Sequence, residues 1–502
     1  MALVLALTIE AAQFVFSPLN LIMMFVAVTF GLIMGAIPGL TATMAVALTL
    51  PLTFMMRIDT AFTFLMAVYV AGVTGGKVSA ILLRIPGTPS SVATTFDGFP
   101  MARNGEPERA LGIALGSSAF GTIVGILCLL LIAPPLARFA LAFGPFEYTM
   151  VGVFALTVVS LSRQELLTKA FIATVIGMLA GMVGLSEVDA IPRFTFGRGY
   201  LMAGFELLPV LLGLYAVSQV LLDAERMSLT AKVSTKLKGL FYHIRELAGH
   251  KRNAIRSALI GVGIGIIPGI GGALSNIMAY LQAKKASPYP EKFGTGIPDG
   301  IIASETANNA SIGGALIPLL TLGIPGDGVS AMLLGAFMIH GLQPGPLLFR
   351  NNPELVYGMM LAMLVGVIFI IIQMTVGIRL FARVLGIPKY LLLPVVFSFC
   401  VLGAFSYSNR LSDVGVMLGF GLLGYFCQKN KFPLIAVLLG YILGPIIEYN
   451  LRRALMLSRG DFTPYITRPI SGTLVGMTLL VLVIYVYRRI AALRRSSGDS
   501  EA

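Results

Sequence analysis

The sequence predicts an all-α polytopic membrane protein with about 11–13 transmembrane segments. Hydrophobic residues fill 57% of the 502 positions and charged residues only 12%, whereas soluble domains carry about 25% charged residues. Apolar runs such as 18–37 match the roughly 20 residues that a membrane-spanning helix needs. The repeated tripeptide Ile-Pro-Gly predicts in addition that some of these helices are broken.

The net charge of +13 is explained by loops at the ends of the apolar segments. Cytoplasmic loops of membrane proteins carry an excess of Lys and Arg, so we expect the basic residues to flank a lipid bilayer and to bind no nucleic acid. The stretch 223–257 holds eight Lys or Arg against three acidic residues and is predicted to be a cytoplasmic linker. Counting segments from the basic C-terminal end also places the tail, 491–502, in the cytoplasm.

Ile-Pro-Gly occurs twice in each half of the chain, in the same order. Pro38 aligns with Pro268 at an offset of 230 positions, and Pro86 aligns with Pro325 at 239. Small insertions in a duplicated unit leave such a drift. The four tripeptides begin at Ile37, Ile85, Ile267 and Ile324.

The two repeats, 1–222 and 258–490, are predicted to have inverted orientations. The segment count places Arg103 inside and its equivalent Arg350 outside, which is the relation that an inverted-topology repeat requires. One loop that the count places outside is basic, against the rule, through Arg452, Arg453, Arg459 and Arg468.

Each Pro-Gly is a candidate helix break or tip of a re-entrant hairpin, although a simple kink is the alternative. Unpaired backbone at membrane depth survives only where it is buried in protein or lines a wet cavity. Freed carbonyls and hydroxyls suit an alkali cation, and helix N-termini suit a carboxylate. The candidate substrate- and ion-binding residues at the breaks are Gly39, Thr41, Thr43, Pro86, Gly87, Thr88, Ser90, Ser91, Gly269, Gly271, Pro325 and Gly326. The segment 97–100 is predicted to be a turn toward the loop at Arg103.

Polar residues also precede the second and fourth breaks. Glu305, Asn308 and Asn309 share one helix face, and polar residues at membrane depth are functional by default. Hydrogen bonding between helices by the asparagines is the alternative. Lys77 and Arg84 either extend to the aqueous edge or contact an anionic substrate.

An enzyme is not predicted. His243, His250 and His340 have no metal-ligand spacing, and the glycines around Gly269 fit no nucleotide-binding pattern. We expect no cofactor, apart from a coupling sodium ion or proton, and the identity of any metal stays open.

Eight motifs resemble those of one family, the large membrane subunits of the bacterial tripartite tricarboxylate transporters (TctA). In the first half they are GAIPGLTATMAVALTLPLTF (35–54), IPGTPSSVATTFDGFPMARNGEPERALG (85–112), FGPFEY (143–148) and RFTFG (193–197). In the second half they are IIPGIGGALSNIMAY (266–280), ANNASIGGALIPLLTLGIPG (307–326), GLQPGPLLF (341–349) and RPISG (468–472).

The resemblance implies the permease of a secondary transporter in the bacterial inner membrane, driven by a sodium or proton gradient. It implies two partners, a small TctB-like membrane subunit and a periplasmic TctC-like solute-binding protein, and a tricarboxylate- or dicarboxylate-like substrate. It also implies an elevator-like fold with transport parts at about 18–136 and 258–385 and scaffold parts at about 140–222 and 390–490. A stand-alone ion-coupled organic-anion exporter or channel is the alternative.

Overall fold

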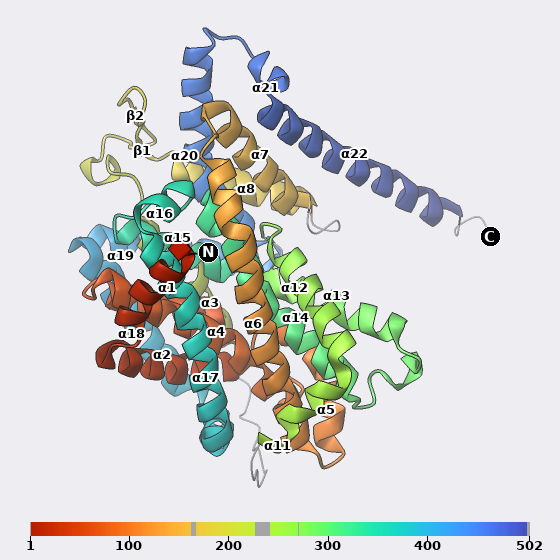
Figure 1. The fold of residues 1–502 in the computed structure, drawn as a ribbon. Coiled ribbons are helices and arrows are strands. Elements are labelled where there is room, and N and C mark those ends of the chain that lie inside the picture. The colour runs from red at the N-terminus through yellow and green to blue at the C-terminus, as the bar shows by residue number, and fades with distance from the viewer. Residues whose placement is uncertain (1, 162–166, 226–240, 270, 499–502) are drawn as a thin grey trace. The chain divides into compact units, whose positions relative to one another are not determined.

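A computed structural model describes residues 2–161, 167–225, 241–269 and 271–498 (Figure 1). Within these residues the regular structure is almost entirely helical, and the one hairpin is formed by the two-residue strands β1 (Gly184–Leu185) and β2 (Pro192–Arg193). The prediction of an all-α protein is therefore confirmed. The chain divides into two compact units, which are described separately.

The first unit, here called the break unit, consists of 1–140 and 207–425 and contains all four Ile-Pro-Gly tripeptides. Its helices are α1 (Ala2–Val15), α2 (Pro18–Ala36), α3 (Ala42–Thr53), α4 (Ile58–Leu83), α5 (Thr94–Arg103), α6 (Pro107–Ala140), α9 (Leu207–Leu211), α10 (Ser218–Glu225), α11 (Phe241–Ile244), α12 (Lys251–Gly265), α13 (Gly271–Ala286), α14 (Pro298–Leu322), α15 (Gly328–Ile339), α16 (Pro346–Asn351), α17 (Pro353–Val384) and α18 (Lys389–Ser408). A π-helical turn, Leu212–Val217, joins α9 to α10, and shorter 3₁₀ turns lie at Pro89–Ser91, Arg245–His250 and Pro290–Lys292.

The second unit consists of 141–206 and 426–502. It contains α7 (Pro145–Leu161), α8 (Leu167–Gly181), the β1–β2 hairpin, a 3₁₀ turn at Gly199–Leu201, α20 (Leu434–Leu457), α21 (Pro464–Thr467) and α22 (Pro469–Gly498). Helix α19 (Leu411–Lys429) belongs to the break unit up to Tyr425. Inside the second unit, Glu448 of α20 pairs with Arg193 of β2 at 2.8 Å, which ties α20 to the hairpin. Glu448 also pairs with Arg452 of the same helix at 2.9 Å.

Nine helices in the described part of the chain are long and apolar enough to cross a membrane. They are α2, α4, α6, the continuous helix Leu207–Glu225, α17, α18, α19, α20 and Pro469–Tyr487 of α22. Four shorter apolar helices are α3, α7, α8 and α15, of which α3 and α15 directly follow breaks. The predicted 11–13 segments exceed the nine long spans because a broken helix yields short pieces that apolar composition alone does not distinguish from full spans.

Small residues bring the helices of each unit close together. No hydrophobic driving force brings helices together in lipid, so Gly-x-x-x-Gly pairs that allow close van der Waals contact between backbones are a common solution. An added Cβ on Gly313 of α14 would touch the backbone of Gly125 in α6, and α14 lies along α6 and α12 (Figure 1). Such pairs occur at Gly31/Gly35, Gly72/Gly76, Gly121/Gly125, Gly261/Gly265, Gly177/Gly181 and Gly440/Gly444.

The two halves of the break unit repeat the same backbone contacts. In the first half an added Cβ on Gly87 would touch the carbonyl oxygen of Gly35 and the Cα of Gly76. In the second half an added Cβ on Gly326 would touch the carbonyl oxygen of Gly265 and the Cα of Ala315. Gly35 and Gly265 are 230 positions apart, and the other two equivalent pairs are 239 positions apart. The opposite orientation of the two repeats relative to a membrane stays a prediction.

The predicted turn at 97–100 is wrong, because these residues lie in α5. The Asp97 carboxylate is buried and accepts the Tyr280 hydroxyl at 2.9 Å and the backbone N–H groups of Gly294, Gly296 and Ile297 at 2.8–3.1 Å. An acid with four donors fixes a helix where Gly98 and Pro100 alone favour a turn.

Parts of the predicted linker and tail lie outside the described residues, namely 226–240 and 499–502. The rest of the linker is helical, since α12 begins at Lys251, and α22 extends to Gly498. Residues 207–222 and 390–425 pack in the break unit. The division into transport and scaffold parts stays a prediction.

The close packing of α12 on α14 predicts a difference between two glycines of α12. An added Cβ on Gly265 would lie 2.6 Å from the Ser311 carbonyl oxygen, whereas Gly263 has no neighbour within 4 Å of that position. We expect Gly265→Ala to destabilise the protein by about 1–3 kcal/mol and Gly263→Ala to be neutral or stabilising, by up to about 1 kcal/mol. Thermal unfolding of the purified variants measures this, and equal Tm changes would contradict the packing.

Candidate functional site

The first break separates α2 from α3. Ile37 is extended, Gly39 has φ of 99°, and the Thr41 hydroxyl accepts the Met44 N–H at 3.2 Å to cap α3. An added Cβ on Gly39 would touch the Asp223 carboxylate. The helix is therefore interrupted here and not merely kinked, and the Thr41 side chain is used by the cap.

The second break follows α4. Arg84 ends α4 in the left-handed region, with φ of 59°, and Gly87 N–H donates to the Gly76 carbonyl at 3.2 Å. The Ser91 hydroxyl accepts the Thr88 N–H at 3.3 Å and donates to the Thr88 carbonyl at 2.8 Å. The Thr88 and Ser90 hydroxyls lie 3.1 Å apart. Ser91 is thus structural, whereas Thr88 and Ser90 form a pair of adjacent hydroxyls.

The third and fourth breaks bond to each other. Gly269 N–H donates to the Gly326 carbonyl at 2.9 Å. Gly269 and Gly271 have φ of 76° and 58°, which explains why glycine occupies both positions. Asp327 caps α15 by accepting the Ser330 N–H at 2.7 Å. The third and fourth breaks therefore satisfy part of each other's broken backbone.

Side chains from the second and third breaks meet beside α14. An added Cβ on Gly272, in the first turn of α13, would lie 2.9 Å from Asn308 Oδ1, 3.0 Å from Ser311 Oγ and 3.1 Å from Ser90 Cβ. The first and fourth breaks also meet, because an added Cβ on Gly328, after the fourth break, would lie 3.2 Å from Oγ1 of Thr43, after the first break. All four breaks therefore converge within the break unit.

Among the described residues Asn308 has no hydrogen-bond partner for either amide atom, although it is only 1% exposed. A buried unpaired polar group costs about 1–3 kcal/mol, so native proteins keep one where a ligand or water completes it. The amide lies beside Ser90 and the first turn of α13, whose N–H groups have no partner within the helix. This arrangement offers N–H and O–H donors to an anion.

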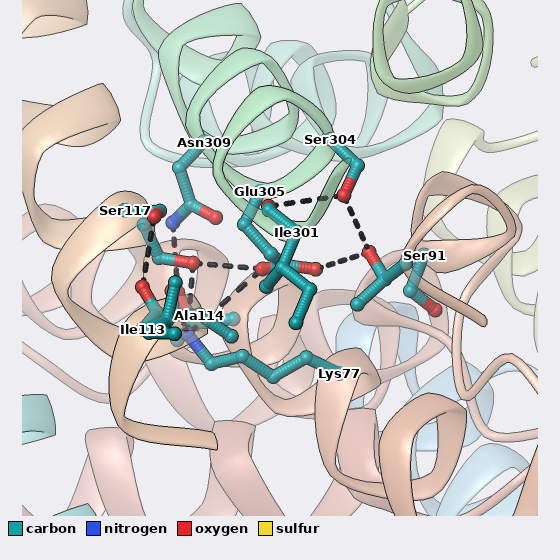
Figure 2. Close-up of polar contacts among 12 residues, drawn as sticks. Lys77, Ser91, Ile113, Ala114, Ser117, Ile301, Ser304, Glu305 and Asn309 are labelled. Carbon is teal, nitrogen blue, oxygen red and sulfur yellow. Dashed lines mark hydrogen bonds and ion pairs between the residues drawn. The ribbon is translucent and has the colours of Figure 1, made fainter. Parts of the chain in front are cut away.

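Asn309 has a different role. Its amide donates to the Thr74 hydroxyl at 2.8 Å and to the Thr122 hydroxyl at 3.1 Å, which joins α14 to α4 and α6. Figure 2 shows Asn309 on the same side of α14 as Glu305. The interhelical hydrogen bonding that was the alternative interpretation for both asparagines describes Asn309 alone.

Glu305 and Lys77 form a buried ion pair between α14 and α4 (Figure 2). Lys77 Nζ lies 3.9 Å from Glu305 Oε2 and donates to Ser118 Oγ at 2.8 Å, and Ser118 donates to Glu305 Oε2 at 2.8 Å. Arg84, in contrast, is exposed, with its guanidinium 5.8 Å from the centre of the Phe99 ring. Of the two basic residues considered, Lys77 alone enters the interior.

The remaining proline candidates lie in the breaks themselves. Pro86 is partly buried between Ile85 and Gly87, and Pro325 is buried directly before Gly326. Both separate a left-handed helix end, at Arg84 or Gly323, from a following cap. They shape the backbone and present no polar side chain.

Sequence reasoning missed Asp327. Its carboxylate accepts the Tyr69 hydroxyl at 2.7 Å. The Tyr215 hydroxyl, on the π-helical turn near Gly328, is buried and has no partner in the described part of the chain. An acid directly after the fourth Pro-Gly was the signal that could have identified it. In the described part of the chain no group of three His, Cys, Asp or Glu side chains could hold a metal ion.

Comparisons of the sequence with known proteins point to one family. Residues 21–439 match the model of the tripartite tricarboxylate transporter TctA family. An Agrobacterium vitis protein described as an uncharacterized 52.8 kDa protein in the TAR-I ttuC' 3' region is 34% identical over 93% of each chain. An uncharacterized protein in the TAR-II ttuC' 3' region of the same organism is 36% identical over 44% of this chain and 91% of its own length. No solved structure matches the chain.

The two asparagines are predicted to contribute unequally to stability. Asn309→Ala removes two hydrogen bonds and leaves their partners buried, so we expect a loss of about 1–3 kcal/mol. Asn308→Ala removes an amide that has no partner, so we expect a clearly smaller loss. Thermal unfolding of the two purified variants without substrate measures the difference, and an Asn308→Ala variant as unstable as Asn309→Ala would show that Asn308 is structural.

Proposed function

The chain belongs to the tripartite tricarboxylate transporter TctA family, and we propose that it is the large permease subunit of a binding-protein-dependent importer of a carboxylate. Family membership confirms the resemblance seen in the motifs. It makes the chain a membrane transporter component, consistent with the nine candidate spans in the described residues. The family is one of transporters and not of enzymes.

One observation carries the substrate class: the unpartnered Asn308 amide lies where the second and third breaks meet. The proposed substrate carboxylate accepts from Asn308 Nδ2, from the Ser90 hydroxyl and from the first-turn N–H groups of α13. The positive end of the α13 dipole favours an anion at this point. These neutral donors orient a carboxylate without binding it so tightly that it cannot leave.

Import is proposed to be coupled to a sodium or proton gradient. The Asp327 carboxylate with the Tyr69 and Tyr215 hydroxyls is an oxygen-rich group next to the first and fourth breaks, which supports a cation or proton near the substrate. Because all four breaks belong to the break unit, we propose elevator-type alternating access in which that unit carries the substrate. The inverted repeats remain part of this proposal.

The proposed partners follow from the family. They are a small TctB-like membrane subunit and a periplasmic TctC-like solute-binding protein that delivers the carboxylate. The chain itself is proposed to lie in the bacterial inner membrane, with its linker and its C-terminus in the cytoplasm. Uptake of ¹⁴C-citrate and ¹⁴C-succinate into vesicles with and without the cognate binding protein tests this dependence. Flux that needs no binding protein would favour the stand-alone exporter or channel.

The site predicts which side chains substrate uptake requires. Loss of one hydrogen bond to a charged ligand costs about 1.5–3 kcal/mol, so we expect Ser90→Ala and Asn308→Ala each to lower the uptake rate at subsaturating substrate by roughly 10–100-fold. Ser398→Ala is the matched control, because Ser398 is exposed on α18 and bonds only to the Pro394 carbonyl in the same helix. Unchanged uptake by both site variants would exclude this substrate site.

A further inference from the structure

Lys77 is a charged residue that the proposed substrate site does not use. Its side chain and that of Glu305 are both 0% exposed. Lys77 Nζ donates to the Ala114 carbonyl at 3.1 Å and to Ser118 Oγ at 2.8 Å, and lies 3.9 Å from Glu305 Oε2. The ammonium is therefore enclosed by oxygen atoms and not extended toward an aqueous edge.

The three oxygens form the kind of donor set that binds a hard cation. One is a backbone carbonyl, one a hydroxyl and one a carboxylate, and hard cations prefer such oxygen ligands. They come from α6 and α14, whereas the ammonium enters from α4. Figure 2 shows Lys77 extending toward Ala114, and Glu305 approaching from the facing helix α14. The positive charge is thus attached to the protein by the lysine side chain.

Glu305 is held as an acceptor that needs a positive neighbour. Thr94 Oγ1 donates to Oε1 at 2.5 Å and Ser118 Oγ donates to Oε2 at 2.8 Å, so both oxygens are fixed by hydroxyls. Removing one partner of a buried ion pair leaves an uncompensated charge, which is strongly unfavourable. Without the ammonium, this site would need another cation or a proton.

The site adjoins the helices that lead to the second and fourth breaks. Lys77 follows Gly76, whose carbonyl accepts the Gly87 N–H of the second break. A cavity of about 10 Å³, roughly the size of one water molecule, touches Ser118 and is lined also by Thr74, Thr122 and Asn309. A cation at this point would join α4, α6 and α14 directly beside the proposed substrate site.

We propose that the Lys77 ammonium is a tethered cation. It occupies a monovalent-cation site whose other ligands are the Ala114 carbonyl, the Ser118 hydroxyl and the Glu305 carboxylate, so the chain holds α4, α6 and α14 together without a sodium ion at this position. If the chain is the carboxylate importer proposed above, a tethered ammonium cannot be released with the substrate, so it contributes no sodium coupling here. Sodium coupling must then use another group, such as Asp327.

The test is sodium binding by Lys77→Ser in the purified full-length chain. Tm is measured with a thiol-reactive dye that reports exposure of the buried Cys400 and Cys427, in NaCl and in choline chloride at equal ionic strength. Lys77→Ser leaves space and an unpaired carboxylate, so we expect a saturable, sodium-specific rise of at least about 2 °C at about 100 mM that wild type lacks. The measurement needs no transport, so failure of the proposed function does not affect it.

Three further variants separate a specific site from a general salt effect. Lys77→Met fills the space without a charge and should show no sodium response. Lys77→Ser combined with Glu305→Gln removes the anionic ligand and should also show none. Lys284→Ser makes the same substitution at an exposed lysine of α13 and should behave as wild type.

The outcomes are decisive in either direction. A sodium response confined to Lys77→Ser supports the proposal, as does a Lys77→Ser protein that folds in NaCl and not in choline chloride. The proposal is overturned if Lys77→Ser and wild type respond identically to sodium. It is also overturned if Lys77→Ser fails to fold in both salts while the double variant folds, because the carboxylate then accepts no free cation.

Discussion

The structure depends on one constraint, which is that broken backbone inside an apolar bundle must find its hydrogen bonds within the protein. Hydrogen bonds between the breaks and to neighbouring helices satisfy this constraint. Gly269 donates to Gly326, Gly87 donates to Gly76, and caps at Thr41 and Asp327 start the following helices. Glycines allow the approach, because a side chain at Gly87 or Gly326 would occupy the space of a neighbouring backbone atom. The convergence of the four breaks follows from this need.

The same backbone contacts occur in both halves, but the side chains that they present differ. Tyr69 and Asn308 are equivalent at an offset of 239, as are Thr88 and Asp327. Tyr69, in the first half, donates to the acid of the fourth break. Asn308, in the second half, lies beside Gly272 of α13, and neither of its amide atoms has a partner among the described residues. A duplicated scaffold thereby offers one neutral, donor-rich group and one acidic group. This asymmetry is the physical basis for proposing an anion and a cation or proton at neighbouring positions.

The positions of the breaks could be predicted from the sequence, because Pro and Gly act locally on the backbone. The partners of individual side chains could not be predicted: Lys77 meets Glu305 across 228 positions, and nothing in the sequence distinguishes the bonded Asn309 from the unpartnered Asn308. The turn predicted at 97–100 was wrong for the same reason, because the backbone donors that bind Asp97 and fix it in α5 lie far away in sequence, at 294–297. Local signals identify elements, whereas tertiary contacts decide what their side chains do.

Cryo-electron microscopy of the full chain with a bound carboxylate would locate the proposed carboxylate site between the second and third breaks. The ligand is chosen as the carboxylate that raises the Tm of the purified chain most. We expect ligand density within hydrogen-bonding distance of Asn308 Nδ2 and Ser90 Oγ, against the first turn of α13. Density elsewhere, with the Asn308 amide still without a partner, would contradict it.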